Sequence, residues 1–102
     1  MINTEGKMEV VNNKKEFCFE IALPDGEYAR LTYRWLKGNM VLMHTLVPAS
    51  QRGKGVGAVL VKYVLEYVRA QNLKAVVYCP FVAKYLESHR EYDDIIEKQS
   101  RN

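Results

Sequence analysis

The spacing of apolar residues changes abruptly near residue 56, and this change limits the folds open to the chain. Before it, short runs alternate apolar and polar residues with the period of two that half-buried strands show. From Val56 to Val68 the apolar residues recur at the offsets of an amphipathic helix. The segment 52–57, Arg-Gly-Lys-Gly-Val-Gly, joins the two halves. The sequence therefore predicts strands, then a glycine-rich loop, then a helix.

Four consecutive antiparallel strands are predicted before the loop, because short polar turns separate the strand-like runs. The runs cover residues 8–12, 16–22, 27–36 and 40–47. In the second run, Phe17, Phe19 and Ile21 are expected on the buried face. Pro48 ends the fourth run, since it cannot donate a ladder hydrogen bond.

After the loop, the pattern predicts a helix, a short buried strand and a second helix. The first helix is expected to close at Asn72 in a left-handed conformation. Its apolar face is predicted to consist of Val56, Val59, Leu60, Tyr63, Val64, Tyr67 and Val68. A β-branched strand follows over residues 74–79, and Pro80 suits the first position of a second helix that reaches His89. Residues 93–102 are expected to form a loose tail.

Length and composition indicate one domain spanning residues 1–102, with 48% hydrophobic and 26% charged residues. The net charge of +3 suits an anionic ligand, but Lys and Arg are scattered, so nucleic-acid binding is not favoured. The chain has no apolar run of a signal peptide or a membrane span, which indicates a cytoplasmic protein without a membrane partner. Two cysteines without CxxC spacing are expected to be reduced thiols.

The three glycines of segment 52–57 allow backbone N–H groups to converge on a phosphate at the start of the helix. A dinucleotide-binding turn is excluded, since it follows the first parallel strand and needs an acidic residue about 20 positions later. The strand in that place, residues 74–79, has no Asp or Glu. A Walker loop is excluded too, because no G-x-x-x-x-G-K followed by Ser or Thr occurs.

The same segment carries a family resemblance. Arg52-x-x-Gly55-x-Gly57 resembles the Gln/Arg-x-x-Gly-x-Gly/Ala signature of the GNAT superfamily of N-acetyltransferases. The chain is most similar to minimal, single-domain GNAT-like acetyltransferases, through His44-Thr45, Pro48, and Cys79-Pro80-Phe81-Val82-Ala83 with Tyr85. The resemblance covers about residues 7–92 and implies an α+β fold with a mixed sheet in the order β-β-β-β-α-β-α. Its fourth and fifth strands would be parallel and splayed.

The resemblance implies that the phosphorylated ligand is coenzyme A, with acetyl-CoA as the donor substrate and no metal. Backbone amides of the loop would hold the pyrophosphate, and an amide near residue 46 or 47 would polarise the thioester carbonyl. The predicted coenzyme-binding residues are Leu46, Val47, Arg52, Gly53, Lys54, Gly55, Val56 and Gly57. Arg52 and Lys54 could equally be solvated charges.

Three side chains are candidates for catalysis. Cys79 lies between a strand and a helix start, where the helix dipole favours a thiolate. His44 could meet Cys79 where the two strands separate and act as a base. The resemblance implies that Tyr85 protonates the departing CoA thiolate. Each also has a structural explanation: Cys79 as a small buried hydrophobe, His44 as a hydrogen-bonded core residue, and Tyr85 as core packing.

These observations lead to the hypothesis of an acetyl-CoA-dependent N-acetyltransferase. An amine would attack the thioester directly, or Cys79 would take the acetyl group first. The acceptor, a small molecule or a peptide amine, is not identified by the residues. The alternative is a non-catalytic module that binds CoA or a partner. His44, Cys79 and His89 do not have the spacing of metal ligands.

Overall fold

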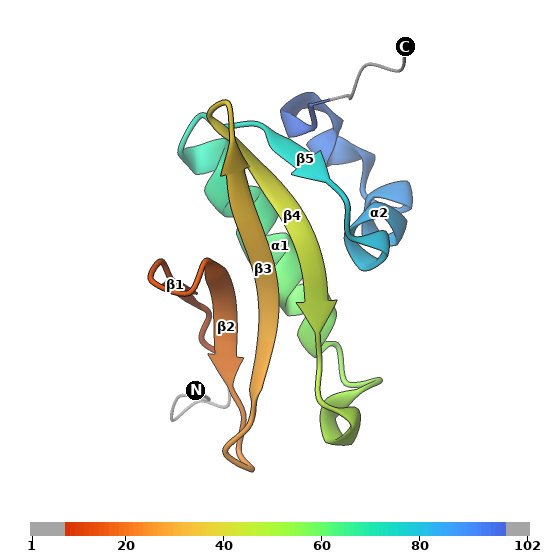
Figure 1. The fold of residues 1–102 in the computed structure, drawn as a ribbon. Helices are drawn as coiled ribbons and strands as arrows, with labels where there is room; N and C mark the ends of the chain where they lie inside the picture. Colours follow the sequence, from red (N-terminus) through yellow and green to blue (C-terminus); the bar gives the residue numbers. More distant parts are fainter. Residues whose placement is uncertain (1–7, 98–102) are drawn as a thin grey trace.

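A computed structural model describes residues 8–97 of the chain. A five-stranded sheet in the order β1-β2-β3-β4-β5 forms one layer, with α1 behind it and α2 beside β5 (Figure 1). The first four strands pair antiparallel, and β4 pairs parallel with β5. The predicted fold class and element order are therefore confirmed. The elements are β1 (Val11–Asn13), β2 (Cys18–Ala22), β3 (Tyr28–Leu36), β4 (Asn39–Leu46), the 3₁₀ helix η1 (Ala49–Gln51), α1 (Val56–Ala70), β5 (Ala75–Val77), α2 (Pro80–Glu87) and the 3₁₀ helix η2 (Arg90–Ile95).

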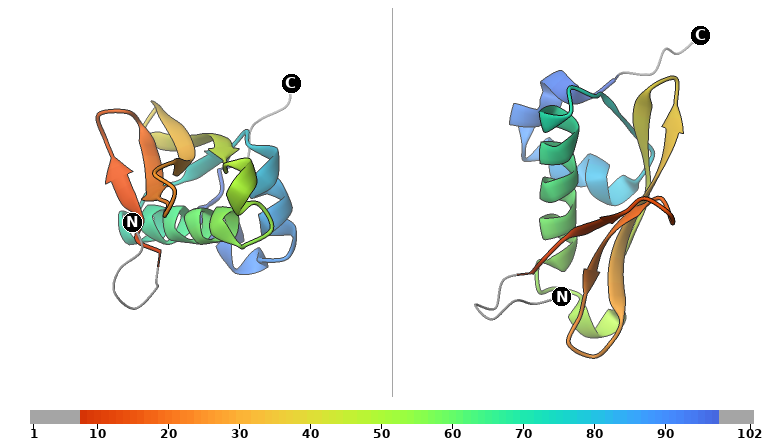
Figure 2. Two further views of the ribbon diagram at one scale, coloured as in Figure 1. Left: turned by 90° about the horizontal axis from the view of Figure 1, so that it is seen from below. Right: turned by 90° about the vertical axis from the view of Figure 1, so that its left-hand side faces the viewer.

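The hydrophobic core lies between the sheet and α1, which crosses only one of the two sheet faces (Figure 2). Large side chains of the sheet and branched side chains of α1 meet there without contact with solvent. Each such side chain contributes about 1.5–3 kcal/mol through the removal of apolar surface from water. The fully buried members include Phe19, Ile21, Leu31, Met40, Leu42, Leu60, Val61, Val64, Leu65 and Val68.

The buried face of α1 is rotated from the predicted one. The predicted burial of Val56, Leu60, Val64 and Val68 is confirmed. Val59 and Tyr63, expected inside, are exposed, whereas Val61 and Leu65 are fully buried. The reason is that α1 contacts α2 and η2 as well as the sheet, so the covered arc extends toward the C-terminal elements. The left-handed conformation predicted for Asn72 after the helix is confirmed, with φ of 58°.

The start of β2 also differs from the prediction. Phe17, expected inside, is 43% exposed and has a left-handed φ of 56°. Its carbonyl accepts a hydrogen bond from the Tyr33 backbone N–H at 2.9 Å. The regular strand begins only at Cys18, which is buried. The prediction that Phe17 shares the buried face of Phe19 and Ile21 is therefore wrong.

The chain after α2 is ordered against the domain rather than loose. η2 buries Tyr92 and Ile95, and Ile96 forms a parallel bridge with Ala75 of β5. Arg69 of α1 bonds both the Asp94 carboxylate and a backbone carbonyl of this segment. The expected loose tail from residue 93 is thus wrong for residues 93–97, because the apolar side chains of η2 complete the covering of α1. Residues 98–102 lie outside those described.

Tyr92 joins this segment to α1, since its hydroxyl donates to Glu66 Oε2 at 2.5 Å. Tyr92→Phe is expected to lower the free energy of unfolding by about 1 kcal/mol near neutral pH, through loss of that hydrogen bond. Burial, followed by the hydrogen bond to Glu66, raises the pKa of Tyr92 above its ordinary value. The unfolded chain therefore loses this proton first, so the stability contributed by neutral Tyr92 is present below about pH 10 and is lost above it. Between about pH 7 and 11, the free energy of unfolding measured with denaturant should fall less steeply for the variant than for the unsubstituted protein. An equal decline in the two proteins would contradict this.

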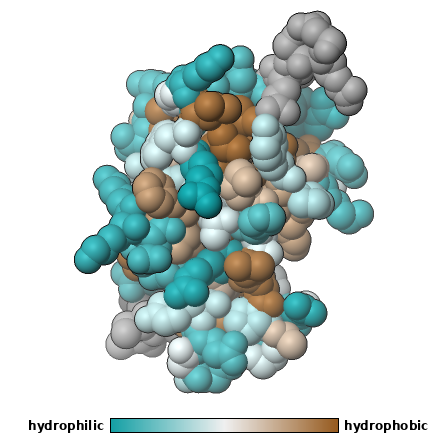
Figure 3. Space-filling view, viewed as in Figure 1, coloured by the Kyte–Doolittle hydropathy of each residue, from teal (hydrophilic) through white to brown (hydrophobic). Residues whose placement is uncertain are grey.

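The sheet face that α1 does not cover shows apolar side chains in separate groups with polar residues between them (Figure 3). Arg30 and Glu20 form an ion pair across β3 and β2 with 3.0 Å between Nε and Oε2. Within residues 8–97, no helix combines the length and the apolar character that a bilayer crossing requires.

Candidate functional site

The two parallel strands run side by side over a short distance and then separate. Residues 40–42 of β4 lie opposite residues 75–77 of β5. At the point of separation, the Leu42 carbonyl accepts hydrogen bonds from the backbone N–H groups of Tyr78 at 3.0 Å and Cys79 at 3.1 Å. Beyond this point β4 pairs with β3 alone. The predicted splay is therefore present, and it leaves one backbone edge of β4 open.

A β-bulge lies in β4 at the place where the strands separate. Thr32 of β3 opposes His44, whereas the next residue of β3, Tyr33, opposes Leu42. Met43 is thus an extra residue without a partner in the register. Because side chains alternate between faces with a period of two, one extra residue reverses the faces of all residues that follow in the strand.

The reversal brings Thr45 rather than His44 to the side of the sheet that carries α1. Thr45 opposes Leu31, which is fully buried, while His44 is exposed on the other face. Thr45 Oγ1 lies 3.2 Å from Cys79 Sγ. The expectation that His44 and Cys79 meet is therefore wrong, since strict alternation along β4 does not include the bulge.

The segment 52–57 carries the chain from β4 into α1 through left-handed backbone. Gly55, with φ of 82°, is the N-cap of α1, a conformation that glycine adopts without steric cost. No side chain caps the helix, and its first turn contains no acidic residue. The first N–H groups of α1 and the positive end of its dipole are therefore not neutralised by α1 itself.

Gly57 has a different role from the other glycines of the loop. It lies inside α1, and a Cβ atom there would come within 2.7 Å of Cζ at the tip of the Phe81 ring. Phe81, from the first turn of α2, is 45% exposed. Gly57 thus allows α2 to pack its aromatic ring against the start of α1.

The turn between β2 and β3 is hydrogen-bonded to η1, the segment that precedes this loop. The carboxylate of Asp25 accepts hydrogen bonds from the backbone N–H of Glu27 and from the Ser50 hydroxyl, both at 3.0 Å. These two donors, the first more strongly, keep the pKa of Asp25 below its usual value. The ionised carboxylate therefore fixes η1, which immediately precedes the glycine segment.

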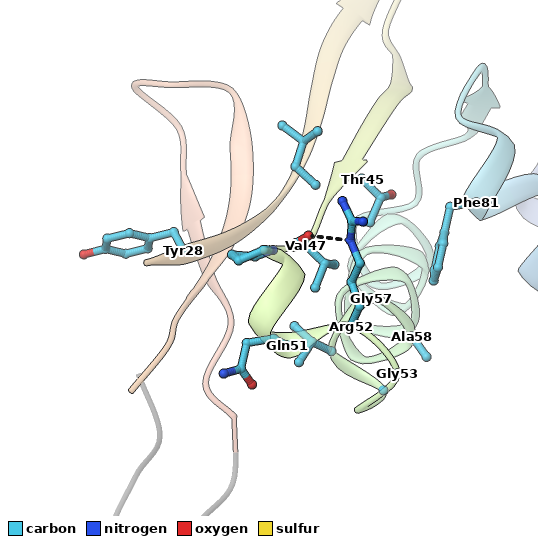
Figure 4. A pocket seen from close by; sticks show the side chains of 13 residues that line it. Tyr28, Thr45, Val47, Gln51, Arg52, Gly53, Gly57, Ala58 and Phe81 are labelled. Atoms are coloured by element: carbon cyan, nitrogen blue, oxygen red, sulfur yellow. Dashed lines mark hydrogen bonds between the residues drawn. The ribbon is translucent and has the colours of Figure 1, made fainter. Parts of the chain in front are cut away.

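A cavity of about 740 Å³ opens between β4, segment 52–57 and the first turn of α2 (Figure 4). The Arg52 side chain extends into it beside Thr45, and Arg52 Nε donates a hydrogen bond to the Val47 carbonyl at 3.3 Å. The size lies within the range of small-molecule and cofactor sites. The cavity is lined by Tyr28, Thr45, Leu46, Val47, Pro48, Gln51, Arg52, Gly53, Gly55, Val56, Gly57, Ala58 and Phe81.

Most residues predicted to bind the coenzyme line this cavity, but Lys54 does not. Among the described residues that line it, only Arg52 carries a charged side chain, so the wall has no carboxylate to repel an anion. The cavity is also lined by residues outside the predicted coenzyme-binding set: Tyr28, Thr45, Pro48, Gln51, Ala58 and Phe81. Ala58 could have been found by helical position, since it lies in the first turn of α1, whereas Phe81 is brought to the wall only by tertiary packing.

Cys79 stands directly behind the cavity wall. It is the N-cap of α2, makes no side-chain cap, and is 2% exposed. It does not line the cavity, whereas Thr45, in contact with its sulfur, does. The first turn of α2 contains no acidic residue, so a negative charge at the N-cap would meet the positive end of the helix dipole.

Tyr85 is not brought to the cavity wall. Its ring stacks on His89 with 4.0 Å between ring centroids and 10° between planes. Burial, more than the nearby carboxylates of Glu91 and Glu66, raises the pKa of Tyr85. His89 Nδ1 lies 3.3 Å from Glu91 Oε2. The predicted catalytic trio is therefore not assembled in one place. No group of three or more His, Cys, Asp or Glu residues within the described part of the chain could hold a metal ion.

Comparisons with known proteins give one matching family, several relatives and a similar solved structure. The sequence model of the family described as GCN5-related N-acetyl-transferase matches residues 18–95. Protein NATD1 of Gallus gallus is 31% identical over 84 residues, which cover 80% of this chain and 76% of the relative. Protein NATD1 of Danio rerio is 28% identical over 96 residues, covering 90% and 87%. The solution structure of a GCN5-like protein from Staphylococcus aureus superposes with a TM-score of 0.69 at 30% identity, covering 92% of both chains.

Proposed function

The chain belongs to the GCN5-related N-acetyltransferase family, and from this premise we propose that it transfers the acetyl group of acetyl-CoA to an amine. The observation that carries the proposal is the cavity beside the N-terminus of α1. Its wall combines a glycine-rich turn, a helix start without a side-chain cap and one cationic side chain, Arg52. This combination suits a pyrophosphate, which backbone N–H groups and a guanidinium can bind together.

The same cavity accommodates the remaining parts of the coenzyme. Gly53 and Gly55 have open space where a Cβ atom would stand, so a ligand can approach their backbone closely. The pantetheine arm would follow the open edge of β4 past Val47 and Leu46, where backbone groups can bind its amides. A backbone N–H of this edge would polarise the thioester carbonyl. Arg52 would exchange its bond to the Val47 carbonyl for one to a phosphate oxygen.

We infer that the transfer proceeds in two steps through Cys79. The Cys79 sulfur attacks the thioester carbonyl carbon, a new carbon–sulfur bond forms, and the bond to the CoA sulfur breaks. The departing CoA thiolate takes up a proton equivalent to the one that Cys79 loses. An amine then attacks acetyl-Cys79, forming the amide, and a proton from the amine returns to the Cys79 sulfur. Direct attack of the amine on acetyl-CoA is the rival route.

We propose a role for His44 in the second step only. It is exposed on the face away from Cys79, close to the separation of β4 and β5. An amine that approaches from that face could give its proton to the imidazole. His44→Gln is therefore expected to slow amide formation by about 100-fold and to leave acetylation of Cys79 unchanged. Rapid-quench measurement of both steps tests this, and equal slowing of the two would contradict it.

Coenzyme binding is tested by titration calorimetry with CoA and with pantetheine, which lacks the phosphates. We expect CoA to bind at least about 100-fold more tightly, because charge-assisted hydrogen bonds to phosphate contribute about 1.5–3 kcal/mol each. Equal affinity for the two would overturn the assignment of segment 52–57 to the pyrophosphate. ADP tests the rival assignment of a nucleotide site, and tighter binding of ADP than of CoA would favour it.

A non-catalytic CoA-binding module is the second candidate function. It is favoured by the burial of Cys79 behind Thr45 and by the position of Tyr85 away from the cavity. Release of free CoA, followed with a thiol reagent across panels of small amines, polyamines and peptides, separates the two. Thiol release that increases with one class of amine supports the enzyme. Binding of acetyl-CoA without thiol release across all panels supports the module.

A further inference from the structure

The hydroxyl of Thr45 is the polar side-chain group that touches the Cys79 sulfur in the described structure, at 3.2 Å. Either atom could donate when both carry a hydrogen. A thiolate has no hydrogen, so in that state the hydroxyl is the donor and the sulfur is the acceptor. A hydrogen bond to a charged acceptor is stronger than one between neutral groups.

The position of Thr45 depends on the bulge at Met43. In a regular strand, the core-facing residue after Leu42 would be His44. The extra residue exposes His44 and turns Thr45 inward, opposite the buried Leu31. With the bulge, the side chain of β4 beside Cys79 is the small hydroxyl group of Thr45, whereas a regular strand would place the His44 imidazole there. Bulges recur beside active sites because they redirect a side chain in this way.

Thr45 also connects Cys79 to the cavity. It lines the cavity, whereas Cys79 lies behind it, nearly fully buried at the start of α2. Two features meet at this sulfur: the N-terminus of α2 and the Thr45 hydroxyl. They come from different elements, so their effects on Cys79 can be separated by substitution.

We propose that Thr45 is the positioning residue of the acyl-transfer site: its hydroxyl, on the cavity wall, donates to the Cys79 thiolate directly behind the wall and orients the sulfur toward the cavity. This inference rests on the proposed function, since it assigns how Cys79 is activated for attack on the thioester. In the first step, the sulfur–carbon bond forms while the hydrogen bond from Thr45 is given up, and the CoA thiolate leaves and is protonated. Thr45 itself forms no covalent bond.

The test compares Thr45→Val, which keeps the shape but removes the hydroxyl, with Thr45→Ser, which keeps the hydroxyl. The free proteins are treated with iodoacetamide at neutral pH, and mass spectrometry follows alkylation of Cys79. We expect Thr45→Val to slow Cys79 alkylation by about tenfold, as the loss of one charge-assisted hydrogen bond requires. Thr45→Ser should restore most of the rate. Alkylation at the buried Cys18 should be the same in all three proteins, which controls for opening of the fold.

A Thr45→Val protein that alkylates as fast as the unsubstituted one, with unchanged Cys18 reactivity, would overturn the proposal. So would equal slowing by valine and serine, since that would show a role of shape alone. CoA affinity is measured on the same three proteins, because Thr45 lines the cavity and an effect on binding has to be separated from an effect on the sulfur. If none of them binds CoA, the proposed function fails, while the alkylation result still decides the contact between Thr45 and Cys79.

A second measurement uses acetyl-CoA as the reagent. At saturating acetyl-CoA, we expect Thr45→Val to slow the formation of acetyl-Cys79 and Thr45→Ser to recover it. A change in affinity with an unchanged maximal rate would contradict a positioning role and assign Thr45 to coenzyme binding instead.

Discussion

Ala58→Asp is expected to weaken CoA binding roughly 100-fold without lowering the stability of the fold. Ala58 lies in the first turn of α1 and lines the cavity. A carboxylate at this position interacts favourably with the helix dipole, by about 0.3–1 kcal/mol, so the variant should unfold at the same or a higher temperature. The same charge would repel a bound pyrophosphate. Two like charges about 5 Å apart at an effective dielectric constant near 20 cost about 3 kcal/mol.

The matched control is Ala58→Asn, which has nearly the same shape and no charge. It should bind CoA within about tenfold of the unsubstituted protein, because only the steric part of the change remains. Titration calorimetry gives the affinities and thermal unfolding gives the stability. Equal loss of affinity in both variants would mean that Asp acts by shape. If Ala58→Asp binds CoA as tightly as the unsubstituted protein, the pyrophosphate does not bind at the N-terminus of α1.

Cys79→Ala is expected to reduce acetyl transfer to an amine by at least about 1,000-fold, the scale on which removal of a nucleophile acts. CoA affinity should be unchanged, because Cys79 does not line the cavity. In the unsubstituted protein, acetyl-CoA without an amine should leave one acetyl group on the peptide that contains Cys79. Mass spectrometry of the digested protein follows this group, and an added amine should remove it.

Cys79→Ser separates packing from chemistry, since serine keeps the approximate shape and a polar atom next to Thr45. It should retain the fold and CoA binding but transfer acetyl groups hardly faster than the alanine variant. Full transfer activity in Cys79→Ala, with Cys79 unmodified at all times in the unsubstituted protein, would reject the covalent route and leave direct attack by the amine.

Local periodicity was enough to predict the element order. The hairpin strands and the long helix have strong patterns, and Pro48 and Pro80 mark boundaries that local chemistry enforces. The junction at segment 52–57 was located correctly for the same reason, because glycine permits the left-handed backbone found at Gly55. Both features depend on residues that are neighbours in sequence.

The arrangement of the site depends on features that periodicity does not show. The bulge at Met43 places Thr45 rather than His44 on the core side of β4. No residue type within residues 40–47 indicates a bulge. Phe81 reaches the cavity because α2 packs on Gly57, a contact between distant parts of the chain. The order of residues 90–97 likewise arises from tertiary contacts of Tyr92 and Asp94 with α1. A short charged sequence in isolation has no such partners.

The central claim is that the start of α1 and the loop before it hold the pyrophosphate of CoA. Adding CoA to isotope-labelled protein while recording backbone amide chemical shifts tests it most directly. We predict the largest changes at residues 53–58, with further changes at Val47 on the open edge of β4. A second cavity of about 560 Å³, lined by residues 8–10 and the outer side of α1 at Val59, Lys62, Tyr63 and Glu66, serves as the comparison. No response of residues 53–58 to saturating CoA, or changes centred instead on this second cavity, would contradict the account.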